Sequence, residues 1–375
     1  MIYLDYSANT PVDARVLEQF CAVERRCIGN ANSHHQAGTA ARAEIDAATL
    51  KIAALLGVQP AEIIYTSGAS EANNFALKGL ARLSRHAGRH IISTPLEHSS
   101  VSGTLTALQE QGYEIDLLDV KQDGTVDLEH LKDLLRPDTI CVAVTLVDSE
   151  LGVVQPVQEI AAILKAYPHC HLHVDATQAV GKIPVSFEGV DTMSLTAHKF
   201  YGLNGIGLLI KRRNLALEPL IHGGESTTIY RSGTPTVALA SSLACALDLA
   251  VTDLPGRVDH VAKLNAELRA ALSTYPLVRI NSPDHAIPHV LNLSVQNVKG
   301  TVFQRELDAK GVCVSVKSAC SSDGLPSRAV FAVSRDRRNA LSSWRISLSH
   351  LTTEDEIKAF LQAFDVCYRE LTAVH

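Results

Sequence analysis

The strongest constraint on the fold is the alternation, between about residues 45 and 215, of short apolar runs with segments of helical periodicity. The run from Thr139 to Val147 is almost entirely apolar, which is typical of a strand covered on both faces. Further strands are expected at 63–67, 90–94, 114–120, 171–175, 193–195 and 207–210, with helices near 71–83, 103–111, 128–135 and 157–167. This alternation predicts an α/β fold with a mostly parallel sheet and helices on both faces. Ligands of such sheets bind at the carboxyl ends of the strands.

The C-terminal third of the chain has a different pattern. A helical stretch at 237–251 reaches Asp253-Leu-Pro-Gly256, which we interpret as a domain boundary. A helix near 258–272, strands near 278–280 and 290–294, and a final helix from Glu354 are expected beyond it. We therefore predict a large domain of residues 14–253 and a smaller α+β domain of residues 1–13 and 254–375.

Composition excludes several classes of protein. The formal net charge of −6 gives no basic footprint for direct nucleic-acid binding. No run of eighteen apolar residues is present, and Met1 is followed by a strand-like pattern rather than a signal sequence, so neither a membrane span nor an exported precursor is expected. The 8 cysteines are scattered singly, which indicates neither a disulfide framework nor a metal site and favours the reducing cytoplasm.

A lysine follows one of the expected strands in an unusual setting. Thr196-Ala-His198-Lys199 ends a strand, and glycines follow at 202, 205 and 207. Most lysines are solvated surface charges, and a cation is costly to bury in an apolar setting without a function. Desolvation frees an amine to attack an aldehyde, so Lys199 is a candidate for a covalent cofactor link.

An acid lies 24 residues upstream of this lysine, at the end of another expected strand. The segment reads His173-Val-Asp175-Ala-Thr-Gln178. An aspartate in this position alone is more often a helix cap. Together with Lys199, Asp175 is a candidate partner for a pyridinium nitrogen, and Gln178 is within reach of a ring oxygen.

Two further motifs follow earlier strands. Ser67-Gly-Ala-Ser70-Glu71 is a strand–turn–helix junction whose free N–H groups predict a phosphate cradle. Glu97-His98 follows the next strand. A lone histidine is usually structural, but one at a strand end can stack on a flat ring and move protons.

Together these elements occur in the chain order 67–71, 98, 175–178 and 198–199. In this order they resemble the class V aminotransferase family of fold-type-I pyridoxal 5'-phosphate (PLP) enzymes, and within it the cysteine desulfurases. The resemblance runs almost end to end. Further segments that carry it are Tyr3–Pro11, Gly29-Asn30 with Ser33 and His35, Gly152–Gln155, Arg231–Thr234, Ser318–Ser322 and Trp344–Leu348.

The resemblance implies a role for each of the strand-end residues. Lys199 would hold the cofactor covalently and act as a base. Asp175 would bind the ring nitrogen and Gln178 the ring oxygen, while His98 would stack on the ring and exchange protons with thiol groups.

It also implies how the phosphate and the substrate are bound. Ala69, Ser70, Thr196 and His198 would surround the phosphate, and Thr234 would reach it from the second subunit of a homodimer. For the L-cysteine substrate, the resemblance implies binding by Arg345 through its carboxylate, with Asn30 and Ser149 nearby.

Cys320 distinguishes the desulfurase branch from ordinary aminotransferases. It lies in Val316-Lys-Ser-Ala-Cys-Ser-Ser-Asp-Gly324, a run of small and turn-forming residues that predicts a loop. A thiol that collects sulfur at the cofactor and delivers it to an acceptor protein needs such a position. The implied activity is conversion of L-cysteine to L-alanine with a persulfide on Cys320, supplying sulfur for iron–sulfur clusters or thiolated tRNA.

The chain departs from the family pattern at a few positions. Asp148-Ser149-Glu150 stands where Asn-Asn-Glu is usual, which puts the substrate contact of Ser149 in question. The segment 225–230 lacks the usual Glu-Arg pair, and Lys317 replaces a common glycine. Two alternatives stay open: another class V PLP enzyme, such as an aminotransferase or a β-lyase, and a non-catalytic scaffold that binds sulfur-transfer partners.

Overall fold

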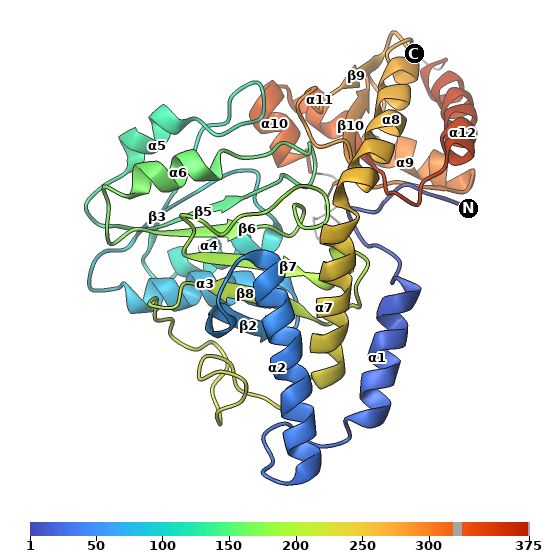
Figure 1. Cartoon of the computed structure of the whole chain (residues 1–375). Helices are drawn as coiled ribbons and strands as arrows, with labels where there is room; N and C mark the ends of the chain where they lie inside the picture. The colour runs from blue at the N-terminus through green and yellow to red at the C-terminus, as the bar shows by residue number, and fades with distance from the viewer. Residues whose placement is uncertain (318–324, 374–375) are drawn as a thin grey trace.

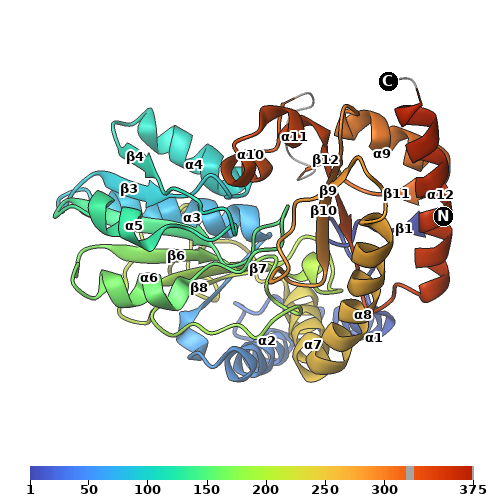
Figure 2. The ribbon, with the colours of Figure 1, turned by 90° about the horizontal axis from the view of Figure 1, so that it is seen from above.

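The computed structural model describes residues 1–317 and 325–373, which form a large α/β part and a smaller α+β part side by side (Figures 1 and 2). The large part is built on a seven-stranded sheet of order β2-β8-β7-β6-β5-β3-β4. β8 runs opposite to the other six strands, which share one direction, so the predicted mostly parallel sheet is confirmed. The strands are β2 (Ile63–Thr66), β3 (His90–Ser93), β4 (Glu114–Leu117), β5 (Thr139–Thr145), β6 (His171–Asp175), β7 (Thr192–Thr196) and β8 (Gly207–Lys211).

Helices cover both faces of this sheet because its central strands are apolar on both sides. Every residue of β5 is buried: Val142 and Val144 pack into one core, and Cys141 and Ala143 pack into another. The first core also receives side chains from α2 (Gln36–Leu56), α5 (Leu128–Leu134), α6 (Val157–Leu164) and α7 (Val237–Thr252). The second receives α3 (Ala69–Leu83) and α4 (Ser99–Gln109). Helix α1 (Ala14–Arg26) packs against α7.

The smaller part has its own core and includes the N-terminal strand. In it, β1 (Ile2–Tyr3) pairs in parallel with β11 (Val312–Cys313), and β10 (Val290–Val295) lies between β9 (Val278–Ile280) and β12 (Ser343–Ser347). Leu4 is buried in the same core as Trp344, which stacks on Phe303 at 5.2 Å between ring centroids. The surrounding helices are α8 (Leu254–Leu272), α9 (Gly300–Ala309), α10 (Arg328–Ser334), α11 (Arg337–Ser342) and α12 (Glu354–Thr372).

Two helices begin four residues earlier than the sequence pattern predicts. The helix predicted from 258 begins at Leu254, with Pro255 in its first turn, where no helical hydrogen bond needs its missing N–H. The helix predicted from 103 begins at Ser99 because the side chain of His98 caps it. Periodicity alone does not show either start.

Helices α7 and α8 meet at Asp253 with a bend of 65° (Figure 1). Within the described ranges, no single helix is long and apolar enough to cross a membrane, and this bent pair meets the criteria only by length and composition. Much of α7 is buried against the rest of the protein.

The aromatic cluster of the smaller part allows a direct test of its packing. Phe364 on α12 is fully buried and lies 5.0 Å from Tyr275 and 5.2 Å from Phe303, measured between ring centroids. Phe364→Ala should lower the free energy of unfolding by about 3–5 kcal/mol through lost burial and a cavity. The measurement is urea unfolding followed by the fluorescence of Trp344, the only tryptophan of the chain.

Val366→Ala is the matched control, since Val366 lies on the same helix with 43% of its surface exposed. It should change the free energy of unfolding by about 0.5 kcal/mol or less. Equal unfolding midpoints for the two variants would contradict this description of the core.

Candidate active site

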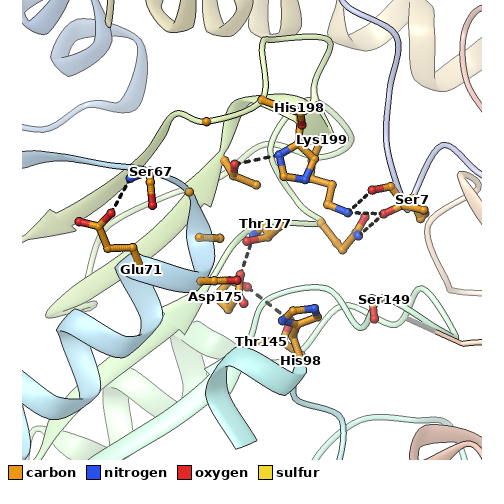
Figure 3. A pocket seen from close by; sticks show the side chains of 18 of the residues that line it. Ser7, Ser67, Glu71, His98, Thr145, Ser149, Asp175, Thr177, His198 and Lys199 are labelled. Carbon is orange, nitrogen blue, oxygen red and sulfur yellow. Dashed lines mark hydrogen bonds between the residues drawn. The ribbon is translucent and has the colours of Figure 1, made fainter. Parts of the chain in front are cut away.

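A cavity of about 360 Å³ lies at the carboxyl ends of the parallel strands, where the smaller part meets the sheet (Figure 3). Its walls come from several distant segments of the chain. Most of the residues predicted from the sequence line it: Ala69, Ser70, His98, Ser149, Asp175, Gln178, Thr196, His198, Lys199 and Arg345.

Lys199 enters the cavity from a short turn that follows β7. The turn, Ala197–Lys199, is a 3-10 helix. The Lys199 amine donates hydrogen bonds to the carbonyl oxygens of Ser7, at 2.7 Å, and Ala8, at 2.6 Å, as Figure 3 shows for Ser7. The N-terminal segment of the smaller part therefore holds this amine in place.

Asp175, at the end of β6, is 4% exposed and faces the same cavity. Its Oδ1 accepts from the backbone N–H of Thr177 at 2.9 Å, and its Oδ2 accepts from the Asn73 amide at 2.8 Å. Both donors, a backbone N–H and a side-chain amide, are neutral groups. A buried carboxylate held in this way is suited to a cationic partner supplied by a ligand.

His98 is held in one tautomer by its place at the start of α4. Its Nδ1 accepts from the backbone N–H of Ser100 at 3.1 Å and lies 2.9 Å from the Ser100 hydroxyl. A backbone N–H can only donate, so Nδ1 carries the lone pair and the proton of the neutral ring is on Nε2. Burial, with further contributions from Lys199 and Arg328, holds the pKa of His98 below its usual value, although Asp175 acts in the opposite direction. The ring is therefore neutral near pH 7 and is a proton donor at Nε2.

Asn73 connects His98 to Asp175, and the sequence pattern did not single it out. It is fully buried on α3, and its amide donates to Asp175 and, at 2.9 Å, to the Ser100 hydroxyl. Its carbonyl oxygen is bound by His173, at 3.0 Å, and by Ser194. The available signal is a pair of asparagines, Asn73 and Asn74, between the apolar residues Ala72 and Phe75 of a helical stretch, although the sequence does not show which of the two is buried.

The predicted phosphate cradle lies at the N-terminus of α3. Gly68 caps this helix with φ +154°, and a Cβ on Gly207 of β8 would lie 2.7 Å from the Cα of Gly68. This close approach of β8 to the turn before α3 requires glycine at 207. Thr196 Oγ1 lies 3.1 Å from His198 Nδ1 beside the cradle. Burial and the nearby Lys199 lower the pKa of His198 to about 4, so its ring is neutral near pH 7 and would contact a phosphate in the neutral form.

These residues fit PLP. The helix N-terminus offers free N–H groups to a phosphate, Lys199 offers an amine to the aldehyde, and Asp175 offers a carboxylate to the ring nitrogen. The Oγ1 of Thr177 is buried without a hydrogen-bond partner among the described residues, which leaves one more polar atom for a ligand at this wall.

Arg345 reaches the opposite wall of the cavity from β12. It is 1% exposed and donates to the backbone oxygen of Ser149 at 2.7 Å and to Asp5 Oδ1 at 2.9 Å. Its Nε is buried with no hydrogen-bond partner inside the described ranges. Asp5 was not predicted as a site residue. The contact between Arg345 and Ser149 uses the backbone oxygen of Ser149, so it does not depend on the side chain at this position. The contact of the Ser149 side chain with the substrate stays a prediction.

Three residues predicted for the site are not found among those that line this cavity. Thr234 lines a neighbouring cavity of about 170 Å³, and Asn30 lies in the turn before α2, so their roles stay predictions. Cys320 lies outside the described residues. The residues that flank its segment, Lys317 and Leu325, line a further cavity of about 490 Å³ together with His98.

No group of three or more His, Cys, Asp or Glu side chains that could hold a metal ion is found within residues 1–317 and 325–373.

Comparison with known proteins identifies the family. The model of the family described as aminotransferase class-V matches residues 2–360. The chain is 40% identical over 365 residues to a protein named cysteine desulfurase IscS of Proteus mirabilis (strain HI4320), covering 95% of this chain and 90% of that protein. It is 36% identical over 378 residues to a protein of the same name from Dictyoglomus turgidum (strain DSM 6724 / Z-1310), covering 100% and 96%.

Solved structures agree with this assignment. A structure named NifS-like protein has a TM-score of 0.92 and 35% identity and covers 99% of both chains. Another, described as SspA in complex with cysteine, has a TM-score of 0.82 and 30% identity and covers 94% of this chain and 100% of that one. The chain therefore belongs to the class V aminotransferase family, whose members depend on PLP.

Proposed function

We propose that this protein is a PLP-dependent cysteine desulfurase, which converts L-cysteine to L-alanine and transfers the sulfur to Cys320 as a persulfide. The observation that carries the proposal is the convergence of Lys199, Asp175 and Arg345 on one cavity, beside which the flanks of the Cys320 segment lie. The names of the IscS and NifS-like relatives support it, as does the similar structure of SspA in complex with cysteine.

The cavity residues divide the chemistry between its two walls. When bound, PLP supplies an electron sink for charge that develops at the substrate Cα. On the sheet side, Lys199 would hold the cofactor before the substrate binds and, once the substrate amine has replaced it, would take the Cα proton; Asp175 would keep a proton at the ring nitrogen. On the opposite side, Arg345 binds the substrate carboxylate with its planar guanidinium.

The sulfur step requires a thiolate and a proton donor. The Cys320 thiolate attacks the substrate sulfur, the carbon–sulfur bond breaks with its electron pair left on the carbon side, and the persulfide forms on Cys320. His98 presents its Nε2 proton to the cavity, so we assign it the role of donor rather than acceptor.

The cellular setting is also part of the proposal. We infer a cytoplasmic enzyme that passes its persulfide sulfur to an acceptor protein. The scattered, single spacing of the cysteines along the sequence supports a reducing compartment.

The role of Lys199 is tested by Lys199→Ala. This variant should lose nearly all turnover and the borohydride-reducible PLP link, because no amine is left at this position to bind the aldehyde. The measurements are alanine formation from L-cysteine and mass spectrometry of the reduced protein. Lys132→Ala, which changes an exposed lysine paired with Glu129, is the control and should retain both. A reducible PLP adduct on another lysine of the Lys199→Ala variant would overturn the assignment.

The role of Cys320 is tested by Cys320→Ser. We expect the variant to bind PLP and L-cysteine, as seen in the cofactor absorption spectrum, but to form no persulfide and to lose sulfide release. Cys21→Ser, a partly buried cysteine on α1, should behave like the parent. Sulfide release at the parental rate from Cys320→Ser would instead indicate a β-lyase that does not use this thiol.

We further propose a homodimer in which Thr234 of each subunit completes the phosphate site of the other. Thr234 does not line the main cavity of its own chain, yet its segment is tied to the cradle by the 2.9 Å ion pair of Arg231 with Glu71. A shared site of this kind couples assembly to cofactor binding.

Thr234→Ala should therefore weaken PLP binding roughly 10- to 100-fold, by loss of one hydrogen bond to a charged group. Thr227→Ala, on the same small cavity, is the control and should not. Light scattering of the parent protein should give twice the chain mass of 40.4 kDa. A PLP-loaded monomer would contradict the proposal.

A further inference from the structure

A buried lysine lies next to the active-site lysine: Lys182 and Lys199 line the same small cavity. Lys182 is 6% exposed and follows β6 by seven residues, four residues after Gln178. The backbone from Ala176 to Ile183 forms successive helical turns, with N–H donation from Val180 to Ala176 and from Lys182 to Ala179. Residues four apart on such turns lie on the same side, so the two side chains meet.

The contact between them fixes the orientation of the Gln178 amide. The Lys182 amine donates to Gln178 Oε1, and Gln178 Nε2 donates to the Ser7 carbonyl at 2.9 Å. A carbonyl can only accept, so the amino group of Gln178 faces Ser7 and its oxygen faces Lys182. Rotation of the amide by 180° would place like groups against each other on both sides.

The surroundings of Lys182 give it no other evident function. A small cavity on its far side is lined by Lys199, Arg257 and His289, and no described carboxylate lines that cavity. Burial, together with the charges of Lys199 and Arg345, lowers the pKa of Lys182 well below its usual value. A buried amine without an acidic partner adds little to the stability of a fold, and an apolar side chain of similar volume often serves as well.

We propose that Lys182 is a positioning residue for the cofactor: by binding the Gln178 oxygen, it makes that side chain present only N–H donors to the active-site cavity. Gln178 lines the cavity, and one of its two amide hydrogens is used by Ser7, which leaves the second for an anionic ring oxygen. The proposal rests on the proposed function only in requiring bound PLP.

The test is a pH titration of the visible absorption of the bound cofactor, without substrate, in the parent and in Lys182→Met. Loss of an oriented donor leaves negative charge at the ring oxygen less stabilised, so the midpoint of the absorption change should move to higher pH in the variant. Because no cysteine is added, this measurement tests the role of Lys182 even if the protein has no desulfurase activity. An unchanged midpoint would overturn the proposal.

Lys211→Met is the matched control. Lys211 is buried like Lys182, but it donates to the backbone carbonyls of Arg212, Arg213 and Leu215, and none of these three residues lines the active-site cavity. It should lower thermal stability and leave the cofactor midpoint unchanged. Lys182→Met should move the cofactor midpoint and leave the melting temperature of the apo-protein equal to or above that of the parent. A large fall in that temperature would instead assign Lys182 a structural role.

A double-mutant cycle with Gln178→Leu separates positioning from direct electrostatics. If Lys182 acts through Gln178, adding Lys182→Met to Gln178→Leu should not move the midpoint further. Additive shifts would show that the charge of Lys182 acts on the cofactor by itself and would overturn the proposal. Lys182→Arg keeps a donor at this position and should return the midpoint toward the parental value, which preserves the test if the methionine variant fails to fold.

Discussion

The register between β6 and β7 is the constraint on which the active site depends. Asp175 pairs with Ser194, so the two strands end side by side at the same edge of the sheet. The chain then continues from β6 to Gln178 and from β7 to Lys199, and both residues line the same cavity. A shift of either strand would separate the groups assigned to the cofactor ring from the lysine assigned to its aldehyde.

Buried polar contacts then hold the side chains at this edge in fixed orientations. Asn73 binds Asp175 directly and reaches His98 through Ser100, so one amide on α3 orients an acceptor and a donor together. Because these groups are shielded from water, each is held by specific partners rather than by solvent. Asp175 and His98 are therefore oriented together at one cavity.

The N-terminal segment joins the two parts of the molecule at the cavity. Its first strand belongs to the smaller part, and the carbonyl of Ser7 then accepts from both Lys199 and Gln178. Two residues earlier, Asp5 is paired with Arg345. A few residues that contribute little to the main core therefore position both the lysine and the proposed substrate arginine.

The sequence by itself determined the mostly parallel sheet and the membership of Lys199, Asp175 and His98 in one site, because strand periodicity and the residues at strand ends are local features. It did not reveal the early start of α4, whose cap depends on a side-chain conformation. Nor did it reveal Asn73, whose partner Asp175 is 102 residues away. Even Lys182, only four residues from Gln178, was decided by the tertiary structure, because its burial and the Ser7 carbonyl that completes the contact come from distant segments. Which donor meets which acceptor is fixed only when the chain is folded.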